Sequence, residues 1–408
     1  MKRSFSFSLS SAVPLIVAAT GLIAAAYGLV RFAYGLLLPE MRAELGFDAA
    51  TAGAVSAGAS VAYCLGAVAG FVLASRAARL LVLAAGATAG AGSLGMALSH
   101  EFAPFAIAAV VSSIGAGLAS PALVDVLRRG VRPGLQGRAQ TIANSGTGPG
   151  LIGAGALALT LLPDWRAVWV VAAIAAVATA LAVAALDGTP ARRETPAALS
   201  TAWLRAHRGP ILAAALLGAG SAGVWNYGRT LLVDEGSSTA GSVVAWVVLG
   251  VGGTAAIATA RWTSTLSPRT AWTITTATAA AGTLGLALAA GTPLALVACL
   301  LFGWGYTAGT GALIAWTASL DPERAATGTA LLFVVLIAGQ AVGAIAIGAL
   351  LDGPGAMIAF TVAAVATLAA GAARRGRRVA PTAATATRSC PQDEQPARPC
   401  TLAVGGAA

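Results

Sequence analysis

Long apolar segments alternate with short polar ones along almost the whole chain. Each apolar segment is near or above the ~20 residues that cross a ~30 Å hydrocarbon layer as a helix. Helices are expected because lipid offers no partner for unpaired backbone groups, and a barrel would show ~10-residue alternating segments. The pattern predicts twelve membrane-spanning helices, at residues 11–38, 49–74, 80–98, 102–126, 139–162, 167–186, 211–233, 239–260, 270–290, 293–318, 325–351 and 356–373.

The composition agrees with an integral membrane protein. Hydrophobic residues make up 57% of the chain and charged residues 10%, whereas soluble domains carry about 25% charged residues. The start MKRSFSFSLSS, followed by apolar residues, has the form of a secretory signal. Because the apolar run continues well past the ~7–15 residues of a signal core, we expect an uncleaved first helix instead.

The net charge of +10 is a signal of membrane topology. With twelve spans and both termini in the cytoplasm, cytoplasmic segments hold twenty-one of the 25 lysines and arginines. Arg42 and Arg166 fall in outside loops, and Arg31 and Arg229 fall within spans. This is the positive-inside pattern. It predicts cytoplasmic termini, and it argues against nucleic acid as the partner of the basic residues.

The chain divides into two halves. The polar segment 187–210 separates six predicted helices at 1–186 from six at 211–373, and residues 374–408 lack apolar periodicity, which predicts a disordered cytoplasmic tail. The fifth helix begins RAQT and the eleventh begins RAAT, while the first and seventh both carry Tyr-Gly. These matches fall where a six-helix repeat would put them. The predicted fold is all-α, with two pseudo-symmetric six-helix bundles and a site between them.

Arg31 lies inside the first predicted span, within YGLVRFAYGLLLPEM. An arginine at the centre of a span costs ~2.5–3.5 kcal/mol, so such residues usually face a cavity. At ~100° per residue, Thr20, Tyr27, Arg31 and Tyr34 share one stripe. We expect this stripe to face the central cavity, with Arg31, Tyr27 and Tyr34 in contact with substrate.

Arg229 has a comparable place on the seventh predicted span, with Trp225 and Asn226 on its stripe. Two arginines from symmetry-related helices would make a clamp for one anionic group, since guanidinium forks match carboxylate and phosphate. We therefore count Arg229, Trp225 and Asn226 as substrate-binding candidates. In the alternative interpretation, both arginines snorkel to headgroups or pair with Glu40, Asp234 or Glu235.

Two further amides are substrate-binding candidates, Asn144 and Gln340, because an amide in lipid is costly without a partner. Ser56, Ser60 and Tyr63 form a polar stripe on the second helix. Such hydroxyls commonly join helices, so packing is the expected role. On the tenth helix, Trp304 is a candidate cavity wall or a packing residue.

Asp125 is the only acid within the predicted spans, at the cytoplasmic end of the fourth, beside Arg128 and Arg129. A local ion pair is its expected role, with gating or coupling as the alternative. Glu40 and Asp234 are the other gating or coupling candidates. The sequence has no phosphate-binding loop and no catalytic grouping, so we expect neither an enzyme nor a cofactor. Its two histidines lie in different loops, so no metal site is expected.

The chain resembles the major facilitator superfamily of secondary transporters over about residues 11–373. The stretches RFAYGLLLPEM, WNYGRTLLVDEG and FGWGYTAGTGALIAW are most similar to the bacterial YbfB/YjiJ branch. Two family signatures are kept only in part. In the loop between the second and third helices, GFVLASRAAR has Ala74 where the family has an acid. On the fourth helix, SSIGAGLASP keeps Gly115 and Gly117, but Val111, four residues before Gly115, stands where the family has an arginine. Gly148-Pro149 in NSGTGPGLIGAG is similar to the antiporter motif.

The resemblance implies a monomeric, multi-pass protein of the bacterial plasma membrane that moves a small molecule by alternating access, with a coupling ion as a second partner. The arginines favour a small organic anion as substrate. The alternative is efflux of amphipathic drugs or secondary metabolites by antiport, suggested by the Gly-Pro motif and the cavity aromatics. Because no predicted span has a mid-span carboxylate, we expect exchange, uniport or proton coupling through a peripheral acid.

Overall fold

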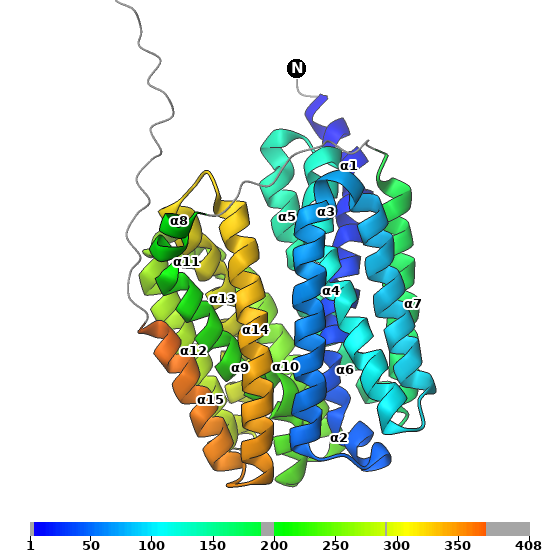
Figure 1. Cartoon of the computed structure of the whole chain (residues 1–408), viewed down its shortest axis with the longest axis vertical. Helices are drawn as coiled ribbons and strands as arrows, with labels where there is room; N and C mark the ends of the chain where they lie inside the picture. Colours follow the sequence, from blue (N-terminus) through cyan, green and yellow to red (C-terminus); the bar gives the residue numbers. More distant parts are fainter. Residues whose placement is uncertain (1–3, 189–199, 290–291, 373–408) are drawn as a thin grey trace, which may run out of the picture.

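A computed structural model describes residues 4–188, 200–289 and 292–372, and this part of the chain is helical without strands (Figure 1). The helices are α1 (Ser4–Ile23), η1 (Ala24–Arg31), α2 (Ala33–Leu45), α3 (Ala49–Leu98), α4 (Phe102–Gly130), η2 (Pro133–Leu135), α5 (Gln136–Asn144), α6 (Thr147–Leu161), α7 (Trp165–Leu186), α8 (Thr201–Ala206), α9 (Arg208–Asp234), α10 (Thr239–Ala258), α11 (Ala260–Thr265), α12 (Pro268–Ala289), α13 (Leu294–Leu320), α14 (Ala325–Asp352) and α15 (Ala356–Gly371).

The predicted apolar stretches fall on these helices. Seven helices of the described residues are long and apolar enough to cross a membrane by length and composition. The number of crossings and the side on which the termini lie stay predictions. The tail 374–408 and most of the linker, 189–199, lie outside the described residues, and the rest of the linker includes the short helix α8.

The second and third predicted spans form one continuous helical segment, α3, with non-helical torsion angles at Ala77. The segment folds back on itself. Gly117 of α4 lies against the backbone of Tyr63, and Gly115 lies against the backbone of Ala85. Tyr63 and Ala85 would be about 33 Å apart in a straight helix, yet they meet neighbouring turns of α4. The break predicted between the second and third spans is therefore a sharp turn inside one continuous helical segment.

Glycines allow the same helix pairing in both halves. In the first half, Gly28 of η1 lies against the backbone of Gly150 of α6. In the second, Gly218 of α9 lies against Leu336 of α14, and Gly339 of α14 lies against Ala215 of α9. A Cβ at any of these positions would overlap backbone atoms, so only glycine permits the approach. The first and fifth predicted spans thus pack closely together, and so do the seventh and eleventh.

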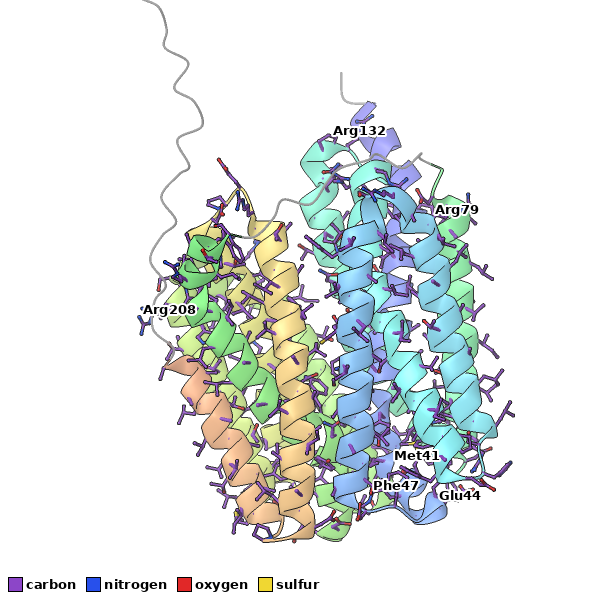
Figure 2. The ribbon with its side chains drawn as sticks, viewed as in Figure 1. Met41, Glu44, Phe47, Arg79, Arg132 and Arg208 are labelled. Carbon is purple, nitrogen blue, oxygen red and sulfur yellow. The ribbon has the colours of Figure 1, made fainter. Side chains whose placement is uncertain are left out.

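Helices α1–α7 and α8–α15 form two groups that lie side by side (Figure 1). Arg79, Arg132 and Arg208 lie toward one end of the molecule, and Met41, Glu44 and Phe47 lie at the other (Figure 2). These three arginines, which the sequence predicts to be cytoplasmic, thus lie toward the same end. We refer to the opposite end, around Glu40 and Asp352, as the outer end.

Candidate functional site

A cavity lies between the two helix groups, lined by residues of η1, α2, α3, α4, α7, α9 and α14. Five of the eight predicted substrate-binding residues line it: Arg31, Tyr34, Trp225, Asn226 and Gln340. No aspartate or glutamate is among its lining residues. The cavity is therefore a site with a positive charge and neutral polar groups.

Arg31 is half-buried and joins the two groups of helices. Its Nη2 donates to Ser60 Oγ at 3.2 Å and to Gln340 Oε1 at 3.0 Å. The centre of its guanidinium lies 4.7 Å from the centroid of the Tyr63 ring. Within the described residues Arg31 has no acidic partner, and its Nε has no acceptor. Its charge is thus met only by neutral groups and by the face of a ring.

A π-helix places Arg31. η1 spans Ala24–Arg31, and the amide of Phe32 donates to the carbonyl of Tyr27 at 2.8 Å, five residues back. Single-turn π segments within α-helices occur frequently at functional sites. No feature of the sequence predicts the π-helix, since a step of ~100° per residue assumes an α-helix. Tyr27, expected to share the stripe of Arg31, is absent from the cavity lining and instead hydrogen-bonds through its hydroxyl to the Tyr63 hydroxyl at 2.9 Å.

Gln340 connects Arg31 to a cluster of aromatic side chains. While its Oε1 accepts from Arg31, its Nε2 donates to the Tyr306 hydroxyl at 3.2 Å. Trp225 stacks on Phe32 with ring centroids 4.2 Å apart and meets Tyr306 edge-on at 5.2 Å. Trp304, proposed from sequence as a cavity wall, donates to Thr259 Oγ1 at 2.9 Å and is not in the lining. Tyr306 of α13 contacts Gln340 and Trp225 but is likewise not in the lining.

Asn226 and Tyr34 make further bonds around the cavity. Asn226 Oδ1 accepts from Ser56 Oγ at 2.7 Å, which is a second bond between the two groups of helices. The Tyr34 hydroxyl is buried and donates to the carbonyl of Ala52 at 3.1 Å. The polar stripe of α3, expected to serve packing, therefore contacts two substrate-binding candidates through Ser56 and Ser60.

Arg229 is not brought together with Arg31. It is buried, and its Nη1 and Nη2 contact both carboxylate oxygens of Glu40, the Nη2 bond being 2.6 Å. Nη1 also donates to the carbonyl of Leu36, and Nε donates to Ser242 Oγ at 3.1 Å. Glu40 is one of the acidic partners named in the alternative interpretation of the sequence. The guanidinium is occupied, so a two-arginine clamp is not formed in this structure.

Asn144 is likewise outside the cavity lining. It is exposed, and its Oδ1 accepts from Gln140 Nε2 at 3.1 Å. Asp234 is exposed at the last residue of α9. Neither residue lies at the site around Arg31.

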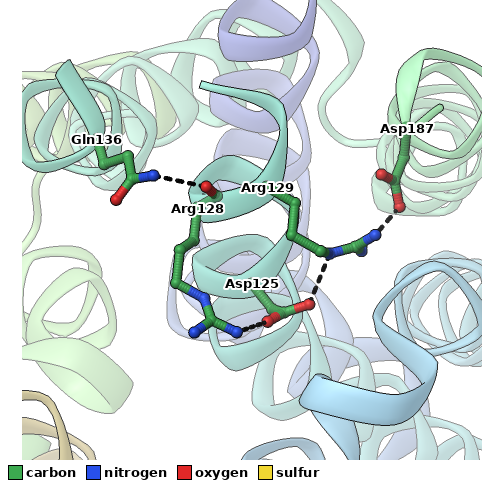
Figure 3. A network of polar contacts seen from close by, with 5 residues as sticks. All are labelled: Asp125, Arg128, Arg129, Gln136 and Asp187. Atoms are coloured by element: carbon green, nitrogen blue, oxygen red, sulfur yellow. Dashed lines mark hydrogen bonds and ion pairs between the residues drawn. The ribbon is translucent and has the colours of Figure 1, made fainter. Parts of the chain in front are cut away.

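Asp125 lies in an ion-pair network at the end of α4 (Figure 3). Its carboxylate accepts from Arg128 at 2.6 Å and from Arg129 at 2.8 Å. Arg129 also contacts Asp187 at 3.1 Å, and Gln136 donates to the carbonyl of Arg128 at 2.6 Å. The local ion pair expected from the sequence is present, and it ties α4 to the end of α7.

The sequence reasoning missed one side of the cavity. Met96 of α3, Ser112 and Ser113 of α4 and Trp169 of α7 line it. Small hydroxyls and a single tryptophan within apolar helices are common packing residues, so their spacing carried no signal. Only the packing of α3, α4 and α7 brings them together. Among the described residues, no group of His, Cys, Asp and Glu is arranged to hold a metal ion.

A comparison with family sequence profiles decides the family. The profile described as Major Facilitator Superfamily matches residues 20–336. The chain belongs to the major facilitator superfamily. It is accordingly a multi-pass protein of the cell membrane that transports small molecules, and not an enzyme. No curated protein sequence matches it.

Solved transporters share the fold of this family member. The crystal structure of the nucleoside transporter NupG aligns with a TM-score of 0.68 and 15% identity over 89% of this chain and 98% of that one. A POT family transporter in complex with a thioalcohol-conjugated peptide gives 0.71 and 12%, over 88% and 94%. The D-xylose-proton symporter gives 0.68 and 14%, over 90% and 97%. At these identities the likeness concerns the fold alone.

Proposed function

We propose that this transporter moves a small organic anion by alternating access, with Arg31 as the principal contact for the negative charge. The observation that carries the proposal is the charge balance at the cavity. Arg31 has only neutral partners in the described residues, and its Nε has no acceptor. A cation buried in an apolar environment is costly unless it is paired. An anionic substrate supplies the missing charge, and a guanidinium binds a carboxylate through two parallel bonds.

Gln340 and Ser60 prepare Arg31 for this role. They hold one terminal nitrogen at 3.0 and 3.2 Å from their oxygens. Since Gln340 belongs to α14 and Ser60 to α3, Arg31 contacts both groups of helices. Rocking of the two groups would change this contact and alter the affinity of Arg31 for the anion. In this proposal the side chains of Tyr34, Trp225 and Asn226 form the rest of the substrate site, while Tyr27 supports Tyr63.

The proposed drive is exchange, uniport or proton coupling through a peripheral acid. Glu40 and Asp125, each of which pairs with an arginine, are the candidates. A proton on Glu40 would weaken its pairing with Arg229 at the outer end. We also propose that the chain belongs to the YbfB/YjiJ branch, on the basis of the sequence stretches RFAYGLLLPEM, WNYGRTLLVDEG and FGWGYTAGTGALIAW.

A second candidate is efflux of an amphipathic compound by antiport. The stacked rings of Phe32 and Trp225 both line the cavity, with centroids 4.2 Å apart, and they offer a flat apolar surface. A lipophilic cation would meet Arg31 as a like charge, so this candidate favours amphipathic anions. Transport of a lipophilic cation at the same rate as an anion would argue against both candidate functions.

The test is substrate binding and counterflow by purified protein in liposomes. The probes are lactate, pyruvate and succinate, compared with neutral sugars and a lipophilic cation. A lost charge-assisted hydrogen bond costs ~1.5–3 kcal/mol, or roughly 10- to 150-fold in affinity. Arg31→Lys keeps the charge without the fork and should bind the acids more weakly, and Arg31→Ala should lose selectivity for anions.

Arg42→Ala is the matched control, because Arg42 donates to the carbonyl of Phe47 and does not line the cavity. It should leave affinity for the acids unchanged. If Arg31 serves only to anchor its helix, Arg31→Ala will insert poorly but bind normally per folded molecule. Unchanged acid affinity in that variant would overturn the proposal.

A further inference from the structure

Buried N–H donors of residues that line the cavity lack acceptors. Eight buried side-chain nitrogen and oxygen atoms lack a hydrogen-bond partner in the described residues. Two of them are N–H groups of residues that line the cavity, Nε of Arg31 and Nε1 of Trp169. Nε1 of Trp225 faces the Tyr306 hydroxyl instead. Buried N–H groups in native proteins are nearly always paired. Arg31 and Trp169 come from different helices around one cavity, and an occupant that carries acceptors would satisfy both donors.

The side-chain amide oxygens of the cavity wall already accept hydrogen bonds. The Oδ1 atom of Asn226 receives the Ser56 hydroxyl, and the Oε1 atom of Gln340 receives Arg31. No carboxylate lies among the lining residues. A ligand that fits this wall therefore presents acceptors, at more than one point, and no surplus of donors.

Trp169 marks a second point, apart from the arginine. It belongs to α7 and its side chain is fully buried, with Ser112 and Ser113 of α4 among the other lining residues of this side. Trp225 and Gln340, in contrast, come from α9 and α14 on the opposite side of the cavity. An occupant of the whole cavity extends from Arg31 toward α7.

We propose that Trp169 is a specificity-determining residue, whose indole N–H binds a second acceptor on the anion. The preferred substrates are then carboxylates that carry a hydroxyl, oxo or second carboxyl group, and plain monocarboxylates are disfavoured. A site with a buried donor rejects the analogue that lacks the acceptor, because the donor stays unpaired. This inference rests on the proposed function, in which Arg31 holds the first carboxylate.

The test compares matched acids on the purified full-length protein. Lactate is paired with propionate, beta-hydroxybutyrate with butyrate, and glutarate with pentanoate, and affinity is measured by competition and by thermal shift. Wild-type protein should prefer at least one acceptor-bearing acid over its partner by about tenfold or more. Trp169→Phe keeps a ring and removes the N–H. It should bring this ratio near one while the affinity for the plain acid changes little.

Trp246→Phe is the matched control. Its indole N–H is also buried without a partner, but Trp246 does not line the cavity. The acid preference of this variant should equal that of the wild type. A ligand series on unaltered protein provides a second measurement. Gamma-aminobutyrate, which carries an ammonium donor at the second point, should bind more weakly than butyrate.

The outcomes separate the two proposals. Acids that bind through Arg31 with the same preference in wild type and Trp169→Phe would overturn this inference alone. Tighter binding of gamma-aminobutyrate than of butyrate would do so without any variant. If no acid of the panel binds the wild-type protein, the anion proposal fails and this inference fails with it.

Discussion

Arg31 and Arg229 are both arginines in predicted membrane spans, but their surroundings give them different roles. Arg229 is satisfied by Glu40, the Leu36 carbonyl and Ser242. Arg31 contacts only neutral oxygens and a ring. Their sequence signals were nearly equal, since each is one charge on a polar stripe. The difference arises from one acid. Glu40 of α2 pairs with Arg229 of α9, whereas no acid of the described residues contacts Arg31.

His207 is a second residue whose role follows from its contacts. It is fully buried at the start of α9, and its ring stacks on Trp203 with centroids 3.7 Å apart. Nδ1 lies 3.0 Å from the Trp203 carbonyl and Nε2 lies 3.1 Å from Thr317 Oγ1. A carbonyl only accepts, so Nδ1 carries the proton and Nε2 accepts from the threonine. The neutral ring thus joins α8 to α13.

Burial lowers the pKa of His207, and the stability of the protein should therefore depend on pH. The unfolded histidine has a pKa of about 6.5. Because the folded pKa is lower, the unfolded state binds more protons, so stability is full above about pH 6.5 and is lost as the pH falls below it. The melting temperature in detergent should fall between about pH 7.5 and pH 5. His207→Gln should flatten this decline.

The exposed His100 provides the control for that measurement. His100→Gln should retain the full decline of the melting temperature. A decline of the same size in His207→Gln would show that other groups cause it.

At the scale of elements, glycine contacts decide how closely the helices pack. Gly35 of α2 faces the backbone of α9, where an added Cβ would lie 1.9 Å from the Trp225 carbonyl oxygen. This contact joins the two groups of helices beside the Arg229–Glu40 pair. It accounts for the Tyr-Gly of the first span by close approach of two backbones. The short sequence match alone did not reveal that role.

Gly35→Ala should separate α2 from α9 and disfavour the conformation closed at the outer end. We expect a lower melting temperature and slower counterflow, since overpacking of this kind typically costs ~1–3 kcal/mol. Gly311→Ala on α13 is the control, because nothing lies within 4 Å of the added Cβ. It should leave stability unchanged or raise it by up to about 1 kcal/mol, because alanine favours a helix interior over glycine. Equal effects of the two variants would refute the close-approach explanation.

At the scale of the whole molecule, polar contacts between the two groups of helices gather at the outer end. Besides Arg229–Glu40, the Tyr227 hydroxyl donates to the carbonyl of Ala49 at 3.0 Å. Asp352, at the end of α14, accepts from the amides of Ala49 and Ala50 at 3.2 and 2.6 Å. A carboxylate at the N-terminus of α3 is also favoured by the helix dipole. We interpret these contacts as a closed outer gate.

Glu40→Gln should loosen this gate, because it leaves the buried Arg229 charge without its partner, a change that typically costs ~3–5 kcal/mol. A cysteine replacing Ala59, which lines the cavity, should then react faster with an impermeant thiol reagent from the outer side. The measurement uses protein without the native cysteines. Asp234→Asn, at an exposed acid of the same end, should not change the rate. Equal labelling in Glu40→Gln and its parent would contradict the gate.

The sequence by itself determined the class of the protein and much of its architecture. Apolar length and low charge predicted membrane helices, and the partial motifs predicted the superfamily that the profile match confirms. The basic residues predicted an orientation that stays to be tested. Five of the eight substrate-binding candidates, Arg31 among them, line the cavity. These features were predictable because they follow from local composition and from the cost of polar groups in lipid.

Only the tertiary structure decided which polar groups meet. The pairing of Arg229 with Glu40 joins residues 189 positions apart. The contact of Arg31 with Gln340 joins residues 309 positions apart, and Trp169 reaches the cavity only through the packing of α7. Tyr27 and Arg31 both contact Tyr63 of α3, but of the two only Arg31 lines the cavity. Periodicity reports which face of a helix is polar, but side-chain partners depend on how helices approach, and glycine contacts between distant segments set that approach.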